Sequence, residues 1–404
     1  MIPEFHRIQS LPPYVFEEVN RLKARLRREG VDIIDFGMGN PDMPTPSHIV
    51  DKLIETARDP KAGRYSASKG ILGLRRAMAG YYERRFGVSL DPETEVVATL
   101  GSKEGFANLA QAITGPGDEV ICPNPAYPIH AYGFIMAGGV IRHVPALSPE
   151  AYLSGASAAA ATGRPKVLIL SYPSNPTAQW VDLDFYREAV ALARKHDLLI
   201  LSDVAYSEIY FDGNPPPSIL QVEGARDLAV EVNSLSKTYA MAGWRVGMVV
   251  GNAKLCAALA RIKSYLDYGA YTPIQVAAAA ALNGPQGCVD EIRGLYRARR
   301  DTLVSALARA GWEIPSPPAS MFAWAPLPEA FRAQGSLAFA KRLMEEAHVA
   351  VSPGVAFGEH GEGYVRIGLV ENEHRIRQAG RNIKRFIDRE LGLAQTEVAP
   401  LEAS

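Results

Sequence analysis

Apolar runs alternate with amphipathic stretches along the chain between about residues 50 and 285. The apolar runs are rich in Val, Ile and Leu rather than strictly alternating, which is typical of strands buried on both faces of a parallel sheet. The stretches between them, such as residues 185–197, carry apolar residues near helical spacing. We therefore predict an α/β unit with a three-layer arrangement and about seven strands. The predicted strands are residues 95–101, 119–124, 140–147, 166–175, 198–206, 228–237 and 245–251.

The last two predicted strands are separated only by residues 238–244. A helical crossover between parallel strands needs about a dozen residues or more, so this gap is too short for one. We therefore expect residues 245–251 to run antiparallel to their neighbour. The predicted sheet is mixed and mostly parallel, with helices on both faces.

The C-terminal part of the chain has a different pattern. Residues 289–311 predict a long helix that ends at a glycine. Two short strand-like pieces, "MFAWAPL" and "YVRIGLV", follow it, and then comes a further helical stretch, "HRIRQAGRNIKRFIDREL". We expect a smaller α+β domain built from both termini. The expected division is an N-terminal arm and part of the small domain at 1–45, a large domain at 46–288, the rest of the small domain at 289–392, and a disordered tail at 393–404.

Composition excludes several classes of protein. The formal net charge is −1, with 47% hydrophobic and 22% charged residues, so no general field attracts nucleic acid or membrane. Three widely spaced cysteines without a C-x-x-C argue against a disulfide framework or a zinc site. We find no signal-peptide pattern and no apolar run of about 18 residues, so we expect a cytoplasmic protein without a metal. The basic segment 21–30 is expected to be a solvated helix face.

Polar residues follow the predicted strands, and the carboxyl ends of parallel strands meet at the edge where α/β proteins bind ligands. The glycine turn "GSKEG" opens onto a helix, so the backbone amides of Ser102 and Lys103 would form an anion site. Each such residue alone has an ordinary explanation as a turn, a helix cap or an ion-pair partner. Together they predict a site with an anion cradle, an aromatic face and one amine. The other residues at this edge are Tyr127, Asn175, Asp203, Tyr206, Lys237 and Arg245.

Four segments carry a resemblance to a known family: "GSKEG", "YPSNPTA", "SDVAYSEI" and "SLSKTYAMAGWRVG". Together they resemble the fold-type I aminotransferases of classes I and II, which use pyridoxal 5′-phosphate, over about residues 8 to 390. Three more segments, "LPPYVF", "DFGMGNPD" and "NPAYPIH", are similar to the branch that holds alanine (glutamate–pyruvate) transaminases and LL-diaminopimelate aminotransferases. The large domain would then be the cofactor-binding one.

The resemblance implies roles for the residues at the sheet edge. Lys237 would form the Schiff base with the cofactor aldehyde and then act as the base for the α-proton. Asp203 would pair with the ring nitrogen, Asn175 and Tyr206 would bind the phenolic oxygen, and Tyr127 would lie against the ring. The phosphate would be held by Ser102, Lys103, Ser234, Ser236, Arg245 and Tyr65 of a neighbouring subunit. A homodimer with shared active sites follows from that last assignment.

The substrate side of the site depends on Arg366 in "YVRIGLV". By the resemblance its guanidinium would hold the α-carboxylate through two parallel hydrogen bonds, which a lysine cannot copy. Its ordinary alternative is an ion pair between the domains. Asn175 and the backbone of Gly39 would contact the same carboxylate, and Tyr14 would line the pocket. Ala178 departs from the glycine that is frequent at this position in the family.

The implied reaction moves an amino group from an amino acid to a 2-oxo acid in ping-pong order. We favour alanine with 2-oxoglutarate, giving pyruvate and glutamate, with LL-diaminopimelate or a broad set of neutral amino acids as the alternative. A lyase or synthase on the same fold is a second alternative, since a fold does not fix a reaction. A regulator that binds the cofactor without turnover is disfavoured by the neutral charge and by the few residues before the catalytic fold.

Overall fold

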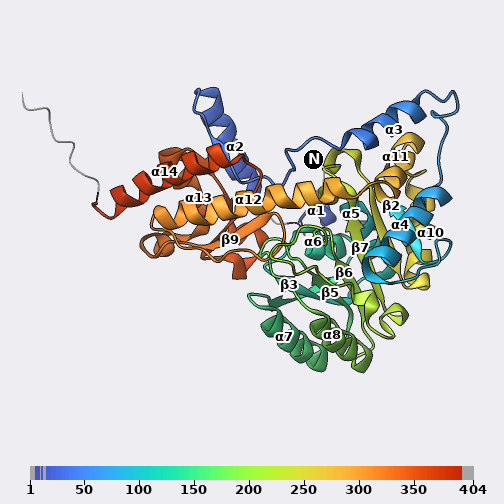
Figure 1. Cartoon of the computed structure of the whole chain (residues 1–404). Coiled ribbons are helices and arrows are strands. Elements are labelled where there is room, and N and C mark those ends of the chain that lie inside the picture. Colours follow the sequence, from blue (N-terminus) through green and yellow to red (C-terminus); the bar gives the residue numbers. More distant parts are fainter. Residues whose placement is uncertain (1–4, 10, 12–14, 394–404) are drawn as a thin grey trace, which may run out of the picture.

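The computed structural model of the chain describes residues 5–9, 11 and 15–393 (Figure 1). Tyr14 and all but the first residue of the predicted tail lie outside the described residues. The helices of the described part include none that is both long and apolar enough to cross a membrane.

A seven-stranded sheet forms the centre of the molecule, with the strand order β2-β8-β7-β6-β5-β3-β4. All seven predicted strands are confirmed. β8 is antiparallel to β2 and β7, while the remaining pairs are parallel, as the short gap before β8 predicts. The strands are β2 Val96–Thr99, β3 Glu119–Asn124, β4 Val140–Pro145, β5 Pro165–Ser171, β6 Leu199–Asp203, β7 Ala229–Ser234 and β8 Gly247–Gly251.

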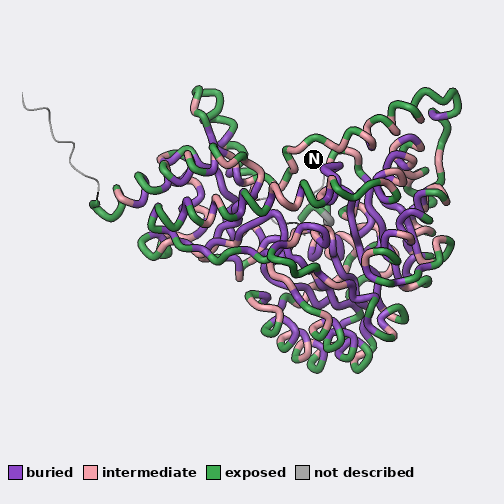
Figure 2. The backbone as a smooth tube through the Cα atoms, viewed as in Figure 1, coloured by how far each residue is buried: buried purple, intermediate pink, exposed green. Residues whose placement is uncertain are grey.

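Helices cover both faces of this sheet, which explains why its strands are continuous apolar runs. In β5, Leu168 and Leu170 enter one hydrophobic cluster, while Val167 and Ile169 enter the cluster on the opposite face. Figure 2 shows the strands buried and the outer sides of the helices exposed. The first face is covered by α4 Leu72–Phe86, α7 Pro149–Thr162, α8 Leu183–Lys195 and α11 Thr272–Asn283, and the second by α5 Ser102–Ile113, α6 Ile129–Met136 and α10 Ala253–Leu266. α3 Ser47–Ala57 packs on α11.

A smaller α+β unit is built from segments near both ends of the chain. Its antiparallel sheet has the order β11-β12-β9, and a parallel pair joins β1 near the N-terminus to β10. Figure 1 shows the C-terminal elements gathered at one side of the large sheet, with α2 beside them. Its elements are α2 Val15–Arg28, β1 Ile34–Asp35, β9 Phe322–Pro326, α13 Gly335–Ala347, β10 Val349–Ala350, β11 Ser352–Pro353, β12 Tyr364–Gly368 and α14 Glu373–Glu390, while the short helix α1 His6–Gln9 lies near α5 and α6 in Figure 1.

The long helix α12 (Gly287–Arg309) runs between the two units (Figure 1). Its 23 residues span about 35 Å at 1.5 Å per residue. Val289 packs into the core of the large unit, whereas Ile292, Tyr296 and Leu303 pack into the core of the small one. The division of the chain at 45/46 and 288/289 stays a prediction.

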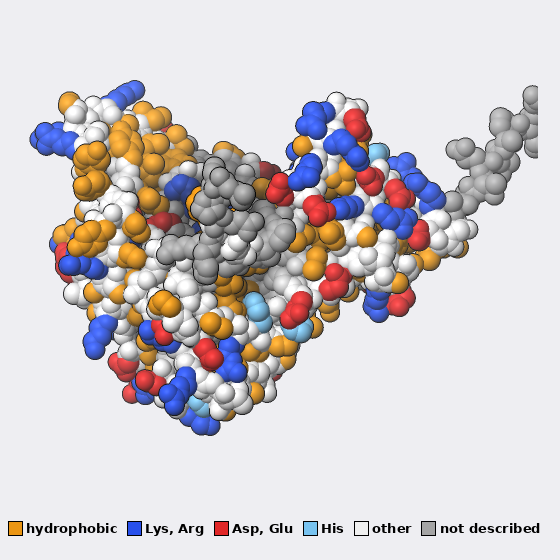
Figure 3. All heavy atoms as spheres, turned by 180° about the vertical axis from the view of Figure 1, so that it is seen from behind, with side chains coloured by type: hydrophobic (Ala, Val, Ile, Leu, Met, Phe, Trp, Pro, Cys, Tyr) orange, Lys and Arg blue, Asp and Glu red, His pale blue; other side chains and the backbone are white. Residues whose placement is uncertain are grey.

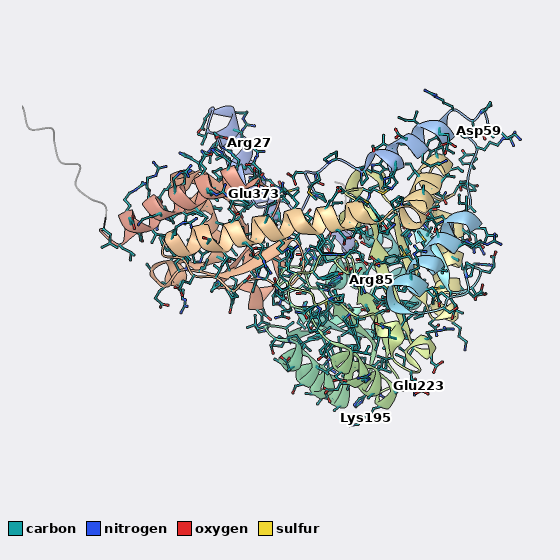
Figure 4. The ribbon with its side chains drawn as sticks, in the orientation of Figure 1. Arg27, Asp59, Arg85, Lys195, Glu223 and Glu373 are labelled. Carbon is teal, nitrogen blue, oxygen red and sulfur yellow. The ribbon has the colours of Figure 1, made fainter. Side chains whose placement is uncertain are left out.

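The basic segment 21–30 is only partly the solvated face that its charge predicts. Arg27, labelled in Figure 4, is exposed at the outer side of α2. Lys23, by contrast, is buried, and its Nζ lies 2.8 Å from Oδ2 of Asp35 on β1. The charge pattern of the helix alone does not reveal this ion pair, because Asp35 comes from a different element.

Candidate active site

A cavity of about 340 Å³ lies where the carboxyl ends of the parallel strands face the small unit. Most of the predicted site residues line it, although they come from segments far apart in the sequence. The predicted residues in the cavity wall are Gly39, Ser102, Lys103, Tyr127, Asn175, Asp203, Tyr206, Ser234, Ser236, Lys237, Arg245 and Arg366. Tyr65 lies elsewhere, and Tyr14 is outside the described residues.

Lys237 lies on a single helical turn, α9 (Leu235–Thr238), rather than at the end of the strand as predicted. The strand ends earlier because the side chain of Ser234 accepts a hydrogen bond from the backbone N–H of Ser236, at 3.1 Å, and so begins the turn. Nζ of Lys237 donates to the carbonyl of Gly39 at 2.6 Å. Burial, with Arg366 and Arg245 nearby, lowers the pKa of Lys237 to about 8. About one amine in ten is therefore uncharged at pH 7, far more than for a lysine with the usual pKa of about 10.4.

Asp203 ends β6 and is buried at the base of the cavity. Its Oδ2 lies 2.8 Å from Nε2 of His130, and its Oδ1 accepts the backbone N–H of Ala205 at 3.1 Å. The sequence prediction missed His130, although it closes the quoted segment "NPAYPIH". This histidine is fully buried at the start of α6, and its Nδ1 has no hydrogen-bond partner among the described residues. The contact fixes the direction of the carboxylate.

The loop after Asp203 is anchored by Glu208, a further residue that the sequence prediction missed. Glu208 is buried, with Oε1 at 3.0 Å from Nε of Arg85 on α4 and Oε2 at 3.3 Å from Nη2 of Arg293 on α12. Figure 4 labels Arg85 in the middle of the molecule. Two arginines and one carboxylate therefore tie the loop that carries Tyr206 to two helices.

Asn175 connects the large sheet to Arg366. Its Oδ1 accepts from Nη1 of Arg366 at 2.8 Å, and its Nδ2 lies 3.5 Å from the hydroxyl of Tyr206. Burial raises the pKa of Tyr206, so its hydroxyl stays protonated and able to donate.

Arg366 lies on β12 and is buried among aromatic rings. Its guanidinium carbon is 4.1 Å from the ring centre of Phe322 and 4.7 Å from that of Phe357. Nη2 also donates to the carbonyl of Gly37 at 3.2 Å. The rings hold the planar group by cation–π contact and remove it from water, which strengthens its interaction with a carboxylate.

The opposite end of the cavity is suited to an anion. α5 begins directly after Gly101, so the first amides of this helix point out of its N-terminus. The Ser234 and Ser236 hydroxyls lie 2.9 Å apart, and Arg245 donates from Nη2 to the carbonyl of Leu100 at 3.2 Å. Gly101 has φ +87°, and a Cβ there would lie 2.1 Å from Nη2 of Arg245. Only glycine therefore allows the arginine this close to the helix N-terminus.

These groups fit pyridoxal phosphate in kind. The cavity offers a partly uncharged amine, a cradle of amides, hydroxyls and a guanidinium for a phosphate, and a buried carboxylate for a ring nitrogen. Tyr127 adds an aromatic face to the same wall, with its ring centre 5.9 Å from that of His130.

Tyr65 is 86% exposed, and its ring centre lies 4.7 Å from that of Tyr268. Tyr265, Leu266 and Tyr271 are exposed as well. Viewed from behind in Figure 3, hydrophobic side chains gather on the lobe formed by the large unit. Within one chain Tyr65 is therefore part of an outer surface.

Comparisons with known proteins give a consistent result. The family described as aminotransferase class I and II matches residues 31–382. The glutamate-pyruvate aminotransferase AlaC of Escherichia coli is 53% identical over 94% of this chain and 93% of its own. The LL-diaminopimelate aminotransferase of Moorella thermoacetica is 42% identical over 95% of this chain and 98% of its own. A double mutant of Thermus thermophilus aspartate aminotransferase superposes with a TM-score of 0.88 at 30% identity, over 95% of this chain and 100% of its own.

Proposed function

This chain belongs to the class I and II aminotransferases, and we propose that within this family it transfers the amino group of alanine to 2-oxoglutarate. It is a pyridoxal phosphate-dependent transaminase that moves an amino group between an amino acid and a 2-oxo acid. The choice of alanine is supported by one observation, the 53% identity with a glutamate-pyruvate aminotransferase over almost the whole chain. The LL-diaminopimelate aminotransferases, which are the alternative, are less similar, at 40–43% identity.

When bound, pyridoxal phosphate supplies an aldehyde that takes up the amino group and a ring that withdraws electrons from the substrate α-carbon. Lys237 would hold the cofactor covalently and then take the α-proton of the substrate. Asp203, oriented by His130, would keep a proton on the ring nitrogen. Asn175 and Tyr206 would donate to the phenolic oxygen, and Tyr127 would stack on the ring. The first amides of α5, Ser234, Ser236 and Arg245 would bind the phosphate.

A panel of amino donors tests the substrate assignment. We expect alanine with 2-oxoglutarate to give a kcat/KM at least about tenfold above that of LL-diaminopimelate and of other neutral amino acids. These donors differ from alanine in the side chain that the pocket has to accommodate. Pyruvate and glutamate are measured as products. A preference for LL-diaminopimelate would replace this assignment with the alternative one, without changing the reaction class.

Arg366→Lys is expected to raise KM about 10- to 100-fold for both alanine and 2-oxoglutarate, because an ammonium cannot form the two parallel hydrogen bonds to an α-carboxylate. Steady-state kinetics with each substrate in turn measure the effect. Arg375→Lys, on the outer side of α14 where it pairs with Asp32, is the control and should leave both KM values unchanged. An effect on 2-oxoglutarate alone would mean that Arg366 binds a side-chain carboxylate instead.

We further propose a homodimer with shared active sites, in which Tyr65 reaches the phosphate of the partner subunit. The exposed apolar surface around Tyr65 and Tyr268 supports it, because such surfaces usually mark an interaction site. Sedimentation at micromolar concentration should give a two-subunit species. A single-subunit species under these conditions would contradict the shared site.

We propose a cytosolic location as well. The three cysteines are free, and Cys122 and Cys256 are buried as thiols, which suits a reducing compartment. Recovery of the protein from an oxidising compartment after cell fractionation would contradict this location.

A further inference from the structure

We infer that Lys263 is a positioning residue for the phosphate end of the cofactor site. It does not line the main cavity, but it controls the charge and position of the turn that begins α5. The inference rests on the proposed role of this turn and of Arg245 in binding the phosphate.

Lys263 lies on α10 and is fully buried. Its Nζ lies 2.8 Å from Oε1 of Glu104 and 2.9 Å from Oδ2 of Asp267. An ammonium withdrawn from water is stable only when charged partners replace the lost hydration. The two ion pairs therefore fix the positions of the Lys263 ammonium and of both carboxylates relative to one another.

Glu104 connects Lys263 to the turn at the start of α5, which is the proposed phosphate-binding turn. Glu104 lies in the first turn of α5, and its Oε2 accepts the backbone N–H of Leu100 at 2.8 Å. The carbonyl of Leu100 in turn accepts from Arg245. The peptide groups of Leu100 are thus held between the Glu104–Lys263 pair and the guanidinium that would bind the phosphate. The amides of Ser102 and Lys103 follow immediately.

The charges of Lys263 and Glu104 explain how their ion pair would affect phosphate binding. A carboxylate in the first turn of a helix competes with a phosphate for the same positive helix end and repels it. Lys263 offsets the charge of Glu104, and neither residue lines the cavity wall. Without the ammonium, Glu104 would keep only neutral partners, the backbone N–H of Leu100 and Nδ2 of Asn108, beside the proposed phosphate site.

The contact with Asp267 holds the loop between α10 and α11. Oδ1 of Asp267 accepts the backbone N–H of Gly269 at 2.6 Å, and its carbonyl accepts the hydroxyl of Ser68 at 2.5 Å. Ser68 follows Tyr65 by three positions, and Tyr268 stands next to Asp267. The same ammonium therefore also holds the segments that carry these two exposed tyrosines.

Lys263→Met tests the inference by comparing two ligands of the cofactor-free protein, pyridoxal phosphate and pyridoxal, which lacks the phosphate. We expect the Kd for pyridoxal phosphate to rise at least about tenfold, while the Kd for pyridoxal stays within about twofold. Fluorescence titration measures both. Lys254→Met is the control, because Lys254 lies on the same helix but is exposed, and both constants should stay unchanged.

A double variant separates charge from general structural damage. In Lys263→Met with Glu104→Gln, the uncompensated carboxylate in the first turn of α5 is gone, so the affinity for pyridoxal phosphate should return toward that of the wild type. Equal weakening of both ligands in Lys263→Met, unchanged constants, or no recovery in the double variant would each overturn the inference. If the wild type bound pyridoxal phosphate no more tightly than pyridoxal, the proposed phosphate site itself would fail.

Discussion

Lys237→Ala is expected to lower kcat for alanine and 2-oxoglutarate by more than about 10⁴-fold, the upper end of what one positioned proton-transfer group contributes. The variant would lose the amine that we propose holds the cofactor and takes the α-proton. Burial, Arg366 and Arg245 all lower the pKa of this amine to about 8, so no ordinary surface lysine can replace it. The visible absorbance band that accompanies covalent binding of the cofactor should also disappear.

Lys195→Ala is the matched control for this experiment. Lys195 is exposed at the end of α8 and lies at the outer edge of the large unit (Figure 4), so both kcat and the absorbance band should be retained. If Lys237→Ala kept its absorbance band or more than a few per cent of its turnover, another amine would have to hold the cofactor.

Asp203→Ala is expected to lower kcat about 10²- to 10⁴-fold, while the Kd for pyridoxal phosphate changes less than about tenfold. In the proposed mechanism the phosphate and Lys237 would contribute most of the binding, whereas the carboxylate would act by keeping the ring nitrogen charged. Its 2.8 Å contact with buried His130 fixes it in the direction that this role needs. Steady-state kinetics and titration of the cofactor-free variant measure the two effects separately.

Asp184→Ala is a suitable control for this variant, since Asp184 is an exposed carboxylate in the first turn of α8. Unchanged turnover in Asp203→Ala would mean that the ring nitrogen has a different partner. A loss of affinity as large as the loss of turnover would mean that Asp203 mainly holds the cofactor.

The large sheet was predictable because its signal is local. The strands buried on both faces are continuous runs of Val, Ile and Leu, and the short gap before β8 fixes its direction. The strand-end residues follow from the same rule, since parallel strands bring their carboxyl ends to one edge. This is why Asn175, Asp203 and Lys237 could be predicted together as parts of one site.

The residues that were missed depend on contacts between distant segments. His130 and Asp203 are 73 positions apart, and neither a helical period nor a turn signal links them. The aromatic surroundings of Arg366 come from Phe322 and Phe357, which meet only when the small unit has folded. Lys263 looks like one more charge on an amphipathic helix until Glu104 is placed beside it.

The position of Lys237 shows how precisely the end of a strand can be predicted from the sequence. An apolar run followed by polar residues predicts a strand end to within a few positions. The strand in fact ends at Ser234, whose hydroxyl begins the turn that carries the lysine. The sequence therefore predicted that Lys237 lies in the cavity, while the local backbone that carries it depends on one hydrogen bond.

The most direct test of the account is a single half-reaction. The purified enzyme, loaded with pyridoxal phosphate and given L-alanine without any acceptor, should release one pyruvate per subunit and then stop. Removal of the alanine and addition of 2-oxoglutarate should then yield an equal amount of glutamate. Continuous release of pyruvate and ammonia without an acceptor would instead identify a lyase, and the absence of any pyruvate would contradict alanine as the substrate.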